Sequence, residues 1–155
     1  VFAVMLGMGR SLYAKFGKNI SRFLLLGFAG SAVCYITAAL SHNVFVGLAA
    51  CAFTGFCVSM LWPGTLIYMA DMIPHASVAI YALLAAGGDL GGSVAPQLVG
   101  SITDFVSQNG LFAAFAGSLT SEQIGFKVGM LIAAVFPLLG TVVALLMRRA
   151  EKNIN

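Results

Sequence analysis

Four long segments of this sequence are almost free of charged residues, and they constrain the fold more than any other feature. They are residues 23–40, 44–70, 76–102 and 128–147. Crossing a bilayer takes about 20 apolar residues, and a spanning segment must satisfy its backbone hydrogen bonds internally. The alternating pattern of a transmembrane barrel strand is absent. We therefore predict an all-α fold, a polytopic bundle of transmembrane helices.

The composition excludes several classes of protein. Hydrophobic residues make up 60% of the chain and charged residues 8%, whereas soluble domains average about 25% charged residues. The lipid bilayer is therefore the expected surrounding. No basic run carries interleaved aromatic residues, so nucleic-acid binding is not expected. His42 and His75 lack carboxylate or thiol neighbours at ligand spacing, and the three cysteines lack CxxC spacing. We expect no metal and no other cofactor.

The ends of the chain predict a fragment of a larger transmembrane protein. Residues 1–9 are too short to span a bilayer and are expected to be the end of a truncated helix. Residues 10–22 are predicted to form a basic loop, and residues 148–155 a polar tail. An amino-terminal transmembrane half of the same protein is therefore an expected partner.

The connectors between the four segments carry turn and capping signals. Residues 41–43 predict a tight turn. Pro74 is expected to stop one helix, and Ser77 is a candidate N-cap for the next. Residues 110–119 are too short to span and are expected at the membrane interface. Thr120 and Gln123 match a capping box, which predicts that the last helix begins near Ser121.

The basic residues predict the orientation in the membrane. Seven of the eight lysines and arginines precede the first segment or follow the last. Positive charge favours the cytoplasmic side, so both of these ends are expected there. The protein would then be a multi-pass protein of the plasma or inner cell membrane with a cytoplasmic C-terminus. Residues 103–127, which include Lys127, would face outward.

Asp89 is the one charge within the four segments, near the middle of the third. A carboxylate at that depth costs about 2.5–3.5 kcal/mol on insertion scales, so it usually faces the bundle interior, a water-filled cavity or a partner. Small residues share its helical face, among them Ala85, Gly92 and Ser93. We predict a solute-binding or proton-exchanging group. The structural alternative is an aspartate bonded to a neighbouring helix.

Further candidates lie in the second segment. Pro63 removes a helix hydrogen bond and Gly64 lets the backbone yield, so together they predict a hinge. Trp62 is a candidate wall of a binding cavity, and Ser59, three residues earlier, could share its face. The structural alternative is a kinked packing helix with a core tryptophan.

The third segment adds one polar candidate and two glycines. Gln97 lies eight residues beyond Asp89, roughly 80° round the helix. Gly88 and Gly92 form a GxxxG pair that would let another helix approach closely and would permit bending. Gln97 is a candidate cavity residue, and the two glycines are candidate hinge positions.

The segment "RSLYAKFGKN", residues 10–19, resembles the signature loop of the major facilitator superfamily. The positions that match in kind are Leu12, Lys15, Phe16, Gly17 and Lys18, while Arg10, Ala14 and Asn19 depart from the pattern. The stretches "WPGTL", "GGDLGGSVAPQLVGSITD" and "GMLIAAVFPLLG" look like the last three helices of such transporters. They resemble the fucose-permease-like branch less specifically.

This resemblance implies a twelve-helix fold of two pseudo-symmetric halves that alternate access to a midplane site. The chain would be the C-terminal part, from the end of helix 8 to helix 12. Trp62 and Asp89 would lie on the cavity-lining helices 10 and 11. Lys15, Gly17 and Lys18 would belong to a conformational loop that bridges helix ends and helps to hold one state.

The expected function is secondary active transport of a small polar solute, with H⁺ as the coupled ion, and not enzymatic catalysis. One alternative is an intramembrane aspartyl protease, although "AGGD" and "YMAD" depart from the motifs of those enzymes and Asp71 lies at a membrane edge. The other alternative is a structural or channel-like membrane subunit.

Overall fold

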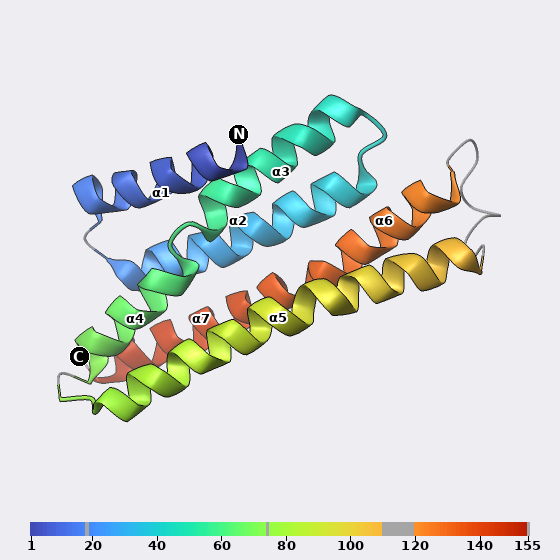
Figure 1. The fold of residues 1–155 in the computed structure, drawn as a ribbon. Coiled ribbons are helices and arrows are strands. Elements are labelled where there is room, and N and C mark those ends of the chain that lie inside the picture. Colours follow the sequence, from blue (N-terminus) through green and yellow to red (C-terminus); the bar gives the residue numbers. More distant parts are fainter. Residues whose placement is uncertain (18, 74, 110–119, 155) are drawn as a thin grey trace.

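The computed structural model describes residues 1–17, 19–73, 75–109 and 120–154, and it contains helices and no strand within those ranges (Figure 1). The seven helices are α1 (Phe2–Phe16), α2 (Ile20–Leu40), α3 (Val44–Val58), α4 (Leu61–Met72), α5 (Val78–Gln108), α6 (Ser121–Ala133) and α7 (Val135–Ile154). The prediction of an all-α fold is confirmed for the described residues. The expectations for Lys18, Pro74 and residues 110–119 lie outside them.

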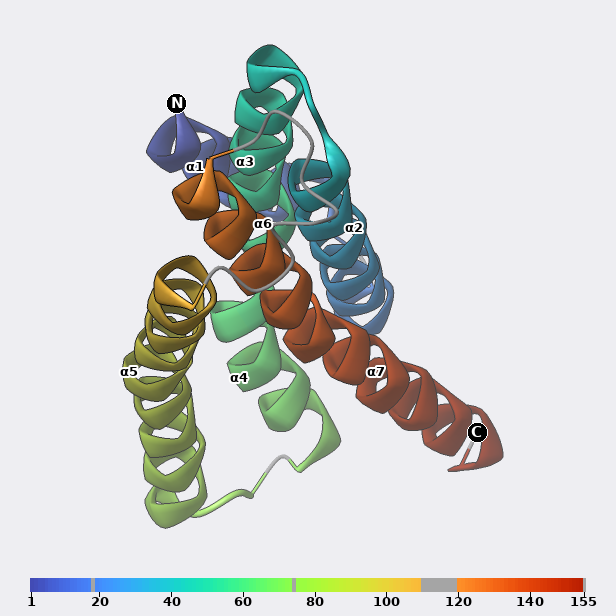
Figure 2. The same cartoon turned by 90° about the vertical axis from the view of Figure 1, so that its right-hand side faces the viewer.

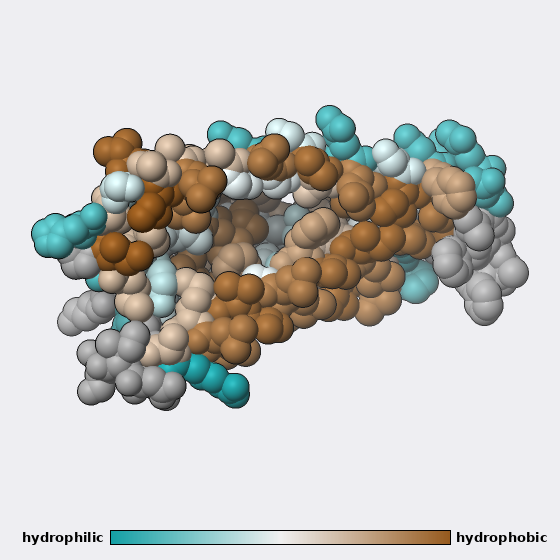
Figure 3. Space-filling model, turned by 90° about the horizontal axis from the view of Figure 1, so that it is seen from below, coloured by the Kyte–Doolittle hydropathy of each residue, from teal (hydrophilic) through white to brown (hydrophobic). Residues whose placement is uncertain are grey.

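Four stretches are long and apolar enough to cross a membrane, as the sequence predicted. They are Ile20–Leu40, Val44–Met72, Val78–Gln108 and Ser121–Ala150. Figure 3 shows the matching surface: hydrophobic side chains cover the middle of this face, and hydrophilic ones gather mainly toward its two ends. The chain is therefore consistent with a multi-pass membrane protein.

Two of the four stretches are interrupted shortly before a proline. α3 ends at Val58 and α4 begins at Leu61, two residues before Pro63. α6 ends at Ala133 and α7 begins at Val135, two residues before Pro137. In each case the proline occupies the first turn of the second helix. Backbone N–H groups in a first turn have no acceptor within their own helix, so a proline there costs no intrahelical hydrogen bond. The helix is thus interrupted for two residues just before Pro63, where the sequence predicted a hinge.

The basic loop expected at residues 10–22 is mostly helical. α1 continues to Phe16, where the backbone N–H of Gly17 donates to the Tyr13 carbonyl at 2.7 Å, and α2 begins at Ile20. Only three residues connect the two helices. No proline or glycine interrupts the chain between Arg10 and Phe16, so the helix has no local reason to end earlier.

Two capping signals hold and one is weaker than expected. At the turn of residues 41–43, the Asn43 Oδ1 accepts from the Phe45 backbone N–H at 2.9 Å. Thr120 and Gln123 form the predicted capping box, and α6 begins at Ser121. Ser77 is the N-cap residue of α5, but its side chain makes no capping hydrogen bond.

Helix α2 lies at the centre and contacts α3, α4, α6 and α7. Close approaches by glycine set this packing: a Cβ on Gly27 would lie 2.7 Å from the Cys57 carbonyl oxygen, and one on Gly64 would lie 3.0 Å from Ile20 and Leu24 side-chain atoms. A small core of Ile20, Leu24 and Met60 fills the junction of α2 with α4.

Helix α5 is the least covered of the long helices, with Val106 as its buried residue. Its C-terminal half packs on α6, where Gly125 and Gly129 approach Thr103, and its N-terminal half contacts α4, where Gly88 approaches Trp62. Figure 2 shows α5 and α7 diverging from the region where α5 meets α6. The N-terminal half of α5, which carries Asp89, is therefore open to its surroundings.

Candidate functional site

Asp89 lies eleven residues beyond the start of α5, and its side chain is exposed. Its backbone carbonyl accepts a hydrogen bond from Ser93 Oγ at 2.8 Å, while its carboxylate contacts no partner among the described residues. The sequence predicted that Asp89 would face the bundle interior, a water-filled cavity or a partner. Among the described residues no packed helix covers this face of α5, so which of the three surrounds Asp89 stays a prediction.

A row of exposed polar side chains runs along α5 from Asp89 toward the C-terminal end. Ser93, Gln97 and Ser101 follow Asp89 at four-residue intervals, and all four residues are exposed. We call these four residues the polar stripe. Each step of four residues turns the helix by about 40°, so the stripe winds slowly round one side of α5. The sequence pointed to Asp89, Ser93 and Gln97 but missed Ser101, for which the four-residue spacing was the available signal.

Trp62 lies beside the residue that precedes Asp89. A Cβ on Gly88 would be 2.9 Å from Trp62 Nε1, so the absence of a side chain there lets the indole rest against α5. The Trp62 side chain is 52% exposed. Together with Gly87 and Gly88 it lines a cavity of about 560 Å³ between α4 and α5. Trp62 thus lines a cavity that Asp89 does not line, and its role in binding stays a prediction.

Ser59 and Trp62 do not lie on the shared helix face that the sequence had suggested. The Ser59 side chain is 3% exposed, and its Oγ donates to the Phe56 carbonyl at 2.7 Å. It packs against Gly9 of α1, where a Cβ would collide with the Ser59 hydroxyl. The two residues diverge because the α3–α4 break lies between them, so the helical spacing assumed from the sequence does not apply.

Arg10 compensates for the hydrogen bond that Pro63 cannot make. In an unbroken helix the N–H of residue 63 would donate to the Ser59 carbonyl. In this structure Arg10 Nε donates to that carbonyl oxygen at 3.1 Å. A carbonyl freed at membrane depth is costly when unpaired, so this contact stabilises the break. Arg10 thus stabilises the α3–α4 junction from its position on α1. The sequence did not predict this contact, because residues 10–22 were expected to form a loop.

The remaining predicted positions are scattered. Gln97 lines a shallow groove of about 450 Å³ with Val94 and Ser101, away from Trp62. Gly64 is buried against α2, whereas a side chain on Gly92 would meet open space. Lys15 is exposed near the end of α1. No movement is described, so the hinge and loop roles stay predictions.

The two aspartates required by a protease lie at different levels. Asp71 is in the last turn of α4. Burial raises the pKa of the Tyr13 phenol near the end of α1, and the negative charge of Asp71 raises it further. Asp89 lies about 16 Å along α5 from that helix's first residue, at 1.5 Å per residue. Because α5 begins on the side where α4 ends (Figure 1), the two carboxylates do not converge.

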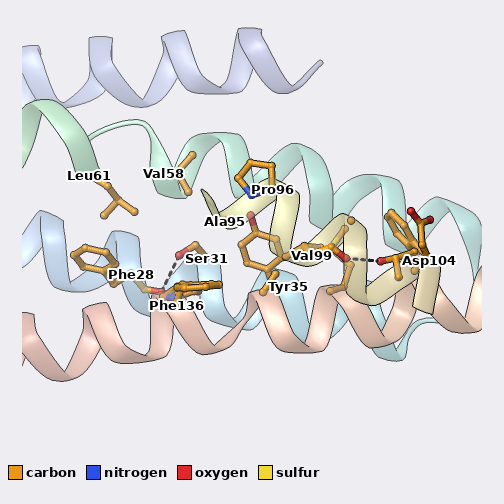
Figure 4. Close-up of a pocket in the computed structure, with 16 residues that line it drawn as sticks. Phe28, Ser31, Tyr35, Val58, Leu61, Ala95, Pro96, Val99, Asp104 and Phe136 are labelled. Carbon is orange, nitrogen blue, oxygen red and sulfur yellow. Dashed lines mark hydrogen bonds between the residues drawn. The ribbon is translucent and has the colours of Figure 1, made fainter. Parts of the chain in front are cut away.

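A further cavity lies between α2, α5, α6 and the start of α7, with a volume of about 730 Å³. It is mainly apolar, and four aromatic side chains line it (Phe28, Tyr35, Phe126 and Phe136), as Figure 4 shows in part. Asp104 is its one ionisable acid. The sequence placed Asp104 in a connector, because the apolar run ends at Ile102, but α5 continues to Gln108.

The described residues contain no group of three His, Cys, Asp or Glu side chains that could hold a metal ion. The comparisons with known proteins do not assign the chain to a family: no family model, no curated protein and no solved structure matches it.

Proposed function

We propose that the protein is a secondary active transporter of the major facilitator type, which moves a small polar solute across the plasma or inner cell membrane. The chain would form the C-terminal transmembrane part of a longer protein, with a cytoplasmic C-terminus. The resemblance of residues 10–19 and of the last three apolar stretches to that family supports the proposal. The all-helical architecture with four candidate spans is compatible with it.

The polar stripe of α5 carries the proposal. A polar face on a membrane helix is unfavourable against lipid, and ionisable residues within spans face a protein interior or water. The stripe is uncovered by the described helices. It is therefore a candidate wall of an aqueous passage whose opposite wall would come from the other half of the same protein.

The chemistry of the stripe suits a small polar solute. Gln97 offers both a donor and an acceptor, Ser93 and Ser101 offer hydroxyl groups, and Trp62 offers an apolar face nearby. The Asp89 carboxylate can bind solute or exchange a proton, since protonation removes the cost of carrying charge through a closed, dehydrated state. In this proposal H⁺ is the coupled ion.

Reconstitution of the longer protein in liposomes tests this proposal. A pH-sensitive dye in the lumen would report proton entry when L-fucose, D-galactose or lactate is added outside, and radiolabelled solute would report uptake. We expect saturable uptake of one of these probes, accelerated by an inward proton gradient, and luminal acidification with it. Absence of saturable flux for all three probes would instead favour the structural or channel-like alternative.

A further inference from the structure

The cavity between α2, α5 and α6 has the properties of a ligand site that is separate from the polar stripe. Its volume of about 730 Å³ lies in the range of sites for small organic molecules, about 300–1,000 Å³. Most of its lining is apolar, and its aromatic residues come from three different helices. Such sites place a few polar groups in an apolar wall, and those groups select the ligand.

The polar groups of this cavity are few, and most are already satisfied. Ser31 Oγ donates to the Phe28 carbonyl at 2.9 Å, and Thr103 Oγ1 donates to the Val99 carbonyl at 2.9 Å (Figure 4). The Tyr35 hydroxyl makes no hydrogen bond to a described residue, and the Asp104 carboxylate has no ion-pair partner among them. A phenol and a carboxylate therefore remain available to a ligand.

The lining of the cavity carries a negative charge and no positive charge. Asp104 lines it, and none of its lining residues is basic. Lys127 follows Phe126 on α6 but lines a different cavity, together with Glu122 and the turn of residues 41–43. A carboxylate attracts a cation through its opposite charge. The faces of aromatic rings attract a cation as well.

The dimensions fix the shape of such a ligand. On α5 the cavity runs from Ala95 to Asp104, about 13 Å at 1.5 Å per residue. Asp104 lies four residues before the end of the helix, so the charge would sit at the membrane boundary and the apolar body would lie below it. A cationic amphiphile takes this orientation in a bilayer.

We infer that this cavity binds a lipophilic organic cation, with Asp104 holding the charge and the aromatic side chains holding the apolar body. The inference goes beyond the proposed transport function and does not depend on it. The probe for its test is tetraphenylphosphonium, and tetraphenylborate is an anion of the same shape.

Equilibrium dialysis of the purified protein in detergent, with protein-free micelles subtracted, measures binding of radiolabelled tetraphenylphosphonium. We expect saturable binding that tetraphenylborate does not displace. Asp104→Asn should weaken it by about tenfold or more, as expected for loss of a close charge partner. Asp71→Asn, the same change at the far end of the bundle, should leave it unchanged.

A second variant tests the cavity independently of its charge. A Cβ on Gly100 meets no atom within 4 Å, so Gly100→Phe can fill the cavity without a backbone clash and should also reduce binding by about tenfold or more. Circular dichroism would verify that both variants fold. Absence of saturable binding, displacement by tetraphenylborate, or unchanged binding in both Asp104→Asn and Gly100→Phe would overturn the inference.

Discussion

Replacing Asp89 with asparagine is expected to abolish proton-driven accumulation of solute while solute exchange persists. Asparagine has nearly the shape of a protonated aspartate but cannot release a proton. A carrier that returns through a closed state only when this position is neutral would then exchange solute without coupling. In liposomes, uptake against a gradient should fall to the protein-free background, and counterflow of preloaded solute should continue.

The matched control is Asp71→Asn, which makes the same chemical change in the last turn of α4, away from the polar stripe. It should leave accumulation near the unmodified level. Full gradient-driven accumulation by Asp89→Asn would remove Asp89 from the coupling mechanism. Loss of both accumulation and counterflow would assign Asp89 to solute binding and not to proton exchange alone.

Gly125→Val is expected to lower the stability of the protein strongly, because Gly125 lies where α6 packs against α5. A Cβ on Gly125 would lie 2.5 Å from the backbone carbonyl oxygen of Thr103. That oxygen belongs to the helix backbone, so the two helices must separate to admit the side chain. We expect a loss of about 3 kcal/mol, at the upper end of the usual range for overpacking, measured as thermal unfolding in detergent.

Gly100→Val is the control for this substitution. It adds the same side chain to α5, where a Cβ at this position meets no atom within 4 Å. Its unfolding temperature should stay close to that of the unmodified protein. Equal stability of the two variants would mean that α5 and α6 are not held together at Gly125.

Local signals in the sequence were enough to predict the four spans, although α5 continues to Gln108 and does not end at Ile102. The uncharged runs predicted four spans because membrane helices need length and apolarity, which neighbouring residues alone supply. The capping box at Thr120 and the break before Pro63 are local in the same sense. The sequence did not predict the length of α1, because helix propensity is weak evidence where basic residues also match a loop signature.

The direction of each helix face was harder to predict because it depends on contacts between distant segments. Ser59 and Trp62 are three residues apart, yet Ser59 packs against Gly9 of α1 and Trp62 packs against Gly88 of α5. Asp89 was expected to face the bundle interior, a water-filled cavity or a partner, and the described helices leave its face uncovered. Asp104 was not singled out, because its place in the cavity lining depends on how α6 packs against α5.

The most direct test of the transport proposal is the accessibility of position 89 to water. Asp89→Cys, in a background where Cys34, Cys51 and Cys57 are replaced, would be treated with a charged, membrane-impermeant thiol reagent in liposomes. Leu83→Cys, on an exposed apolar face of the same helix, serves as the lipid-facing comparison. We predict that the charged reagent labels position 89 and spares position 83. Labelling of position 89 by lipid-soluble reagents alone would contradict an aqueous passage along α5.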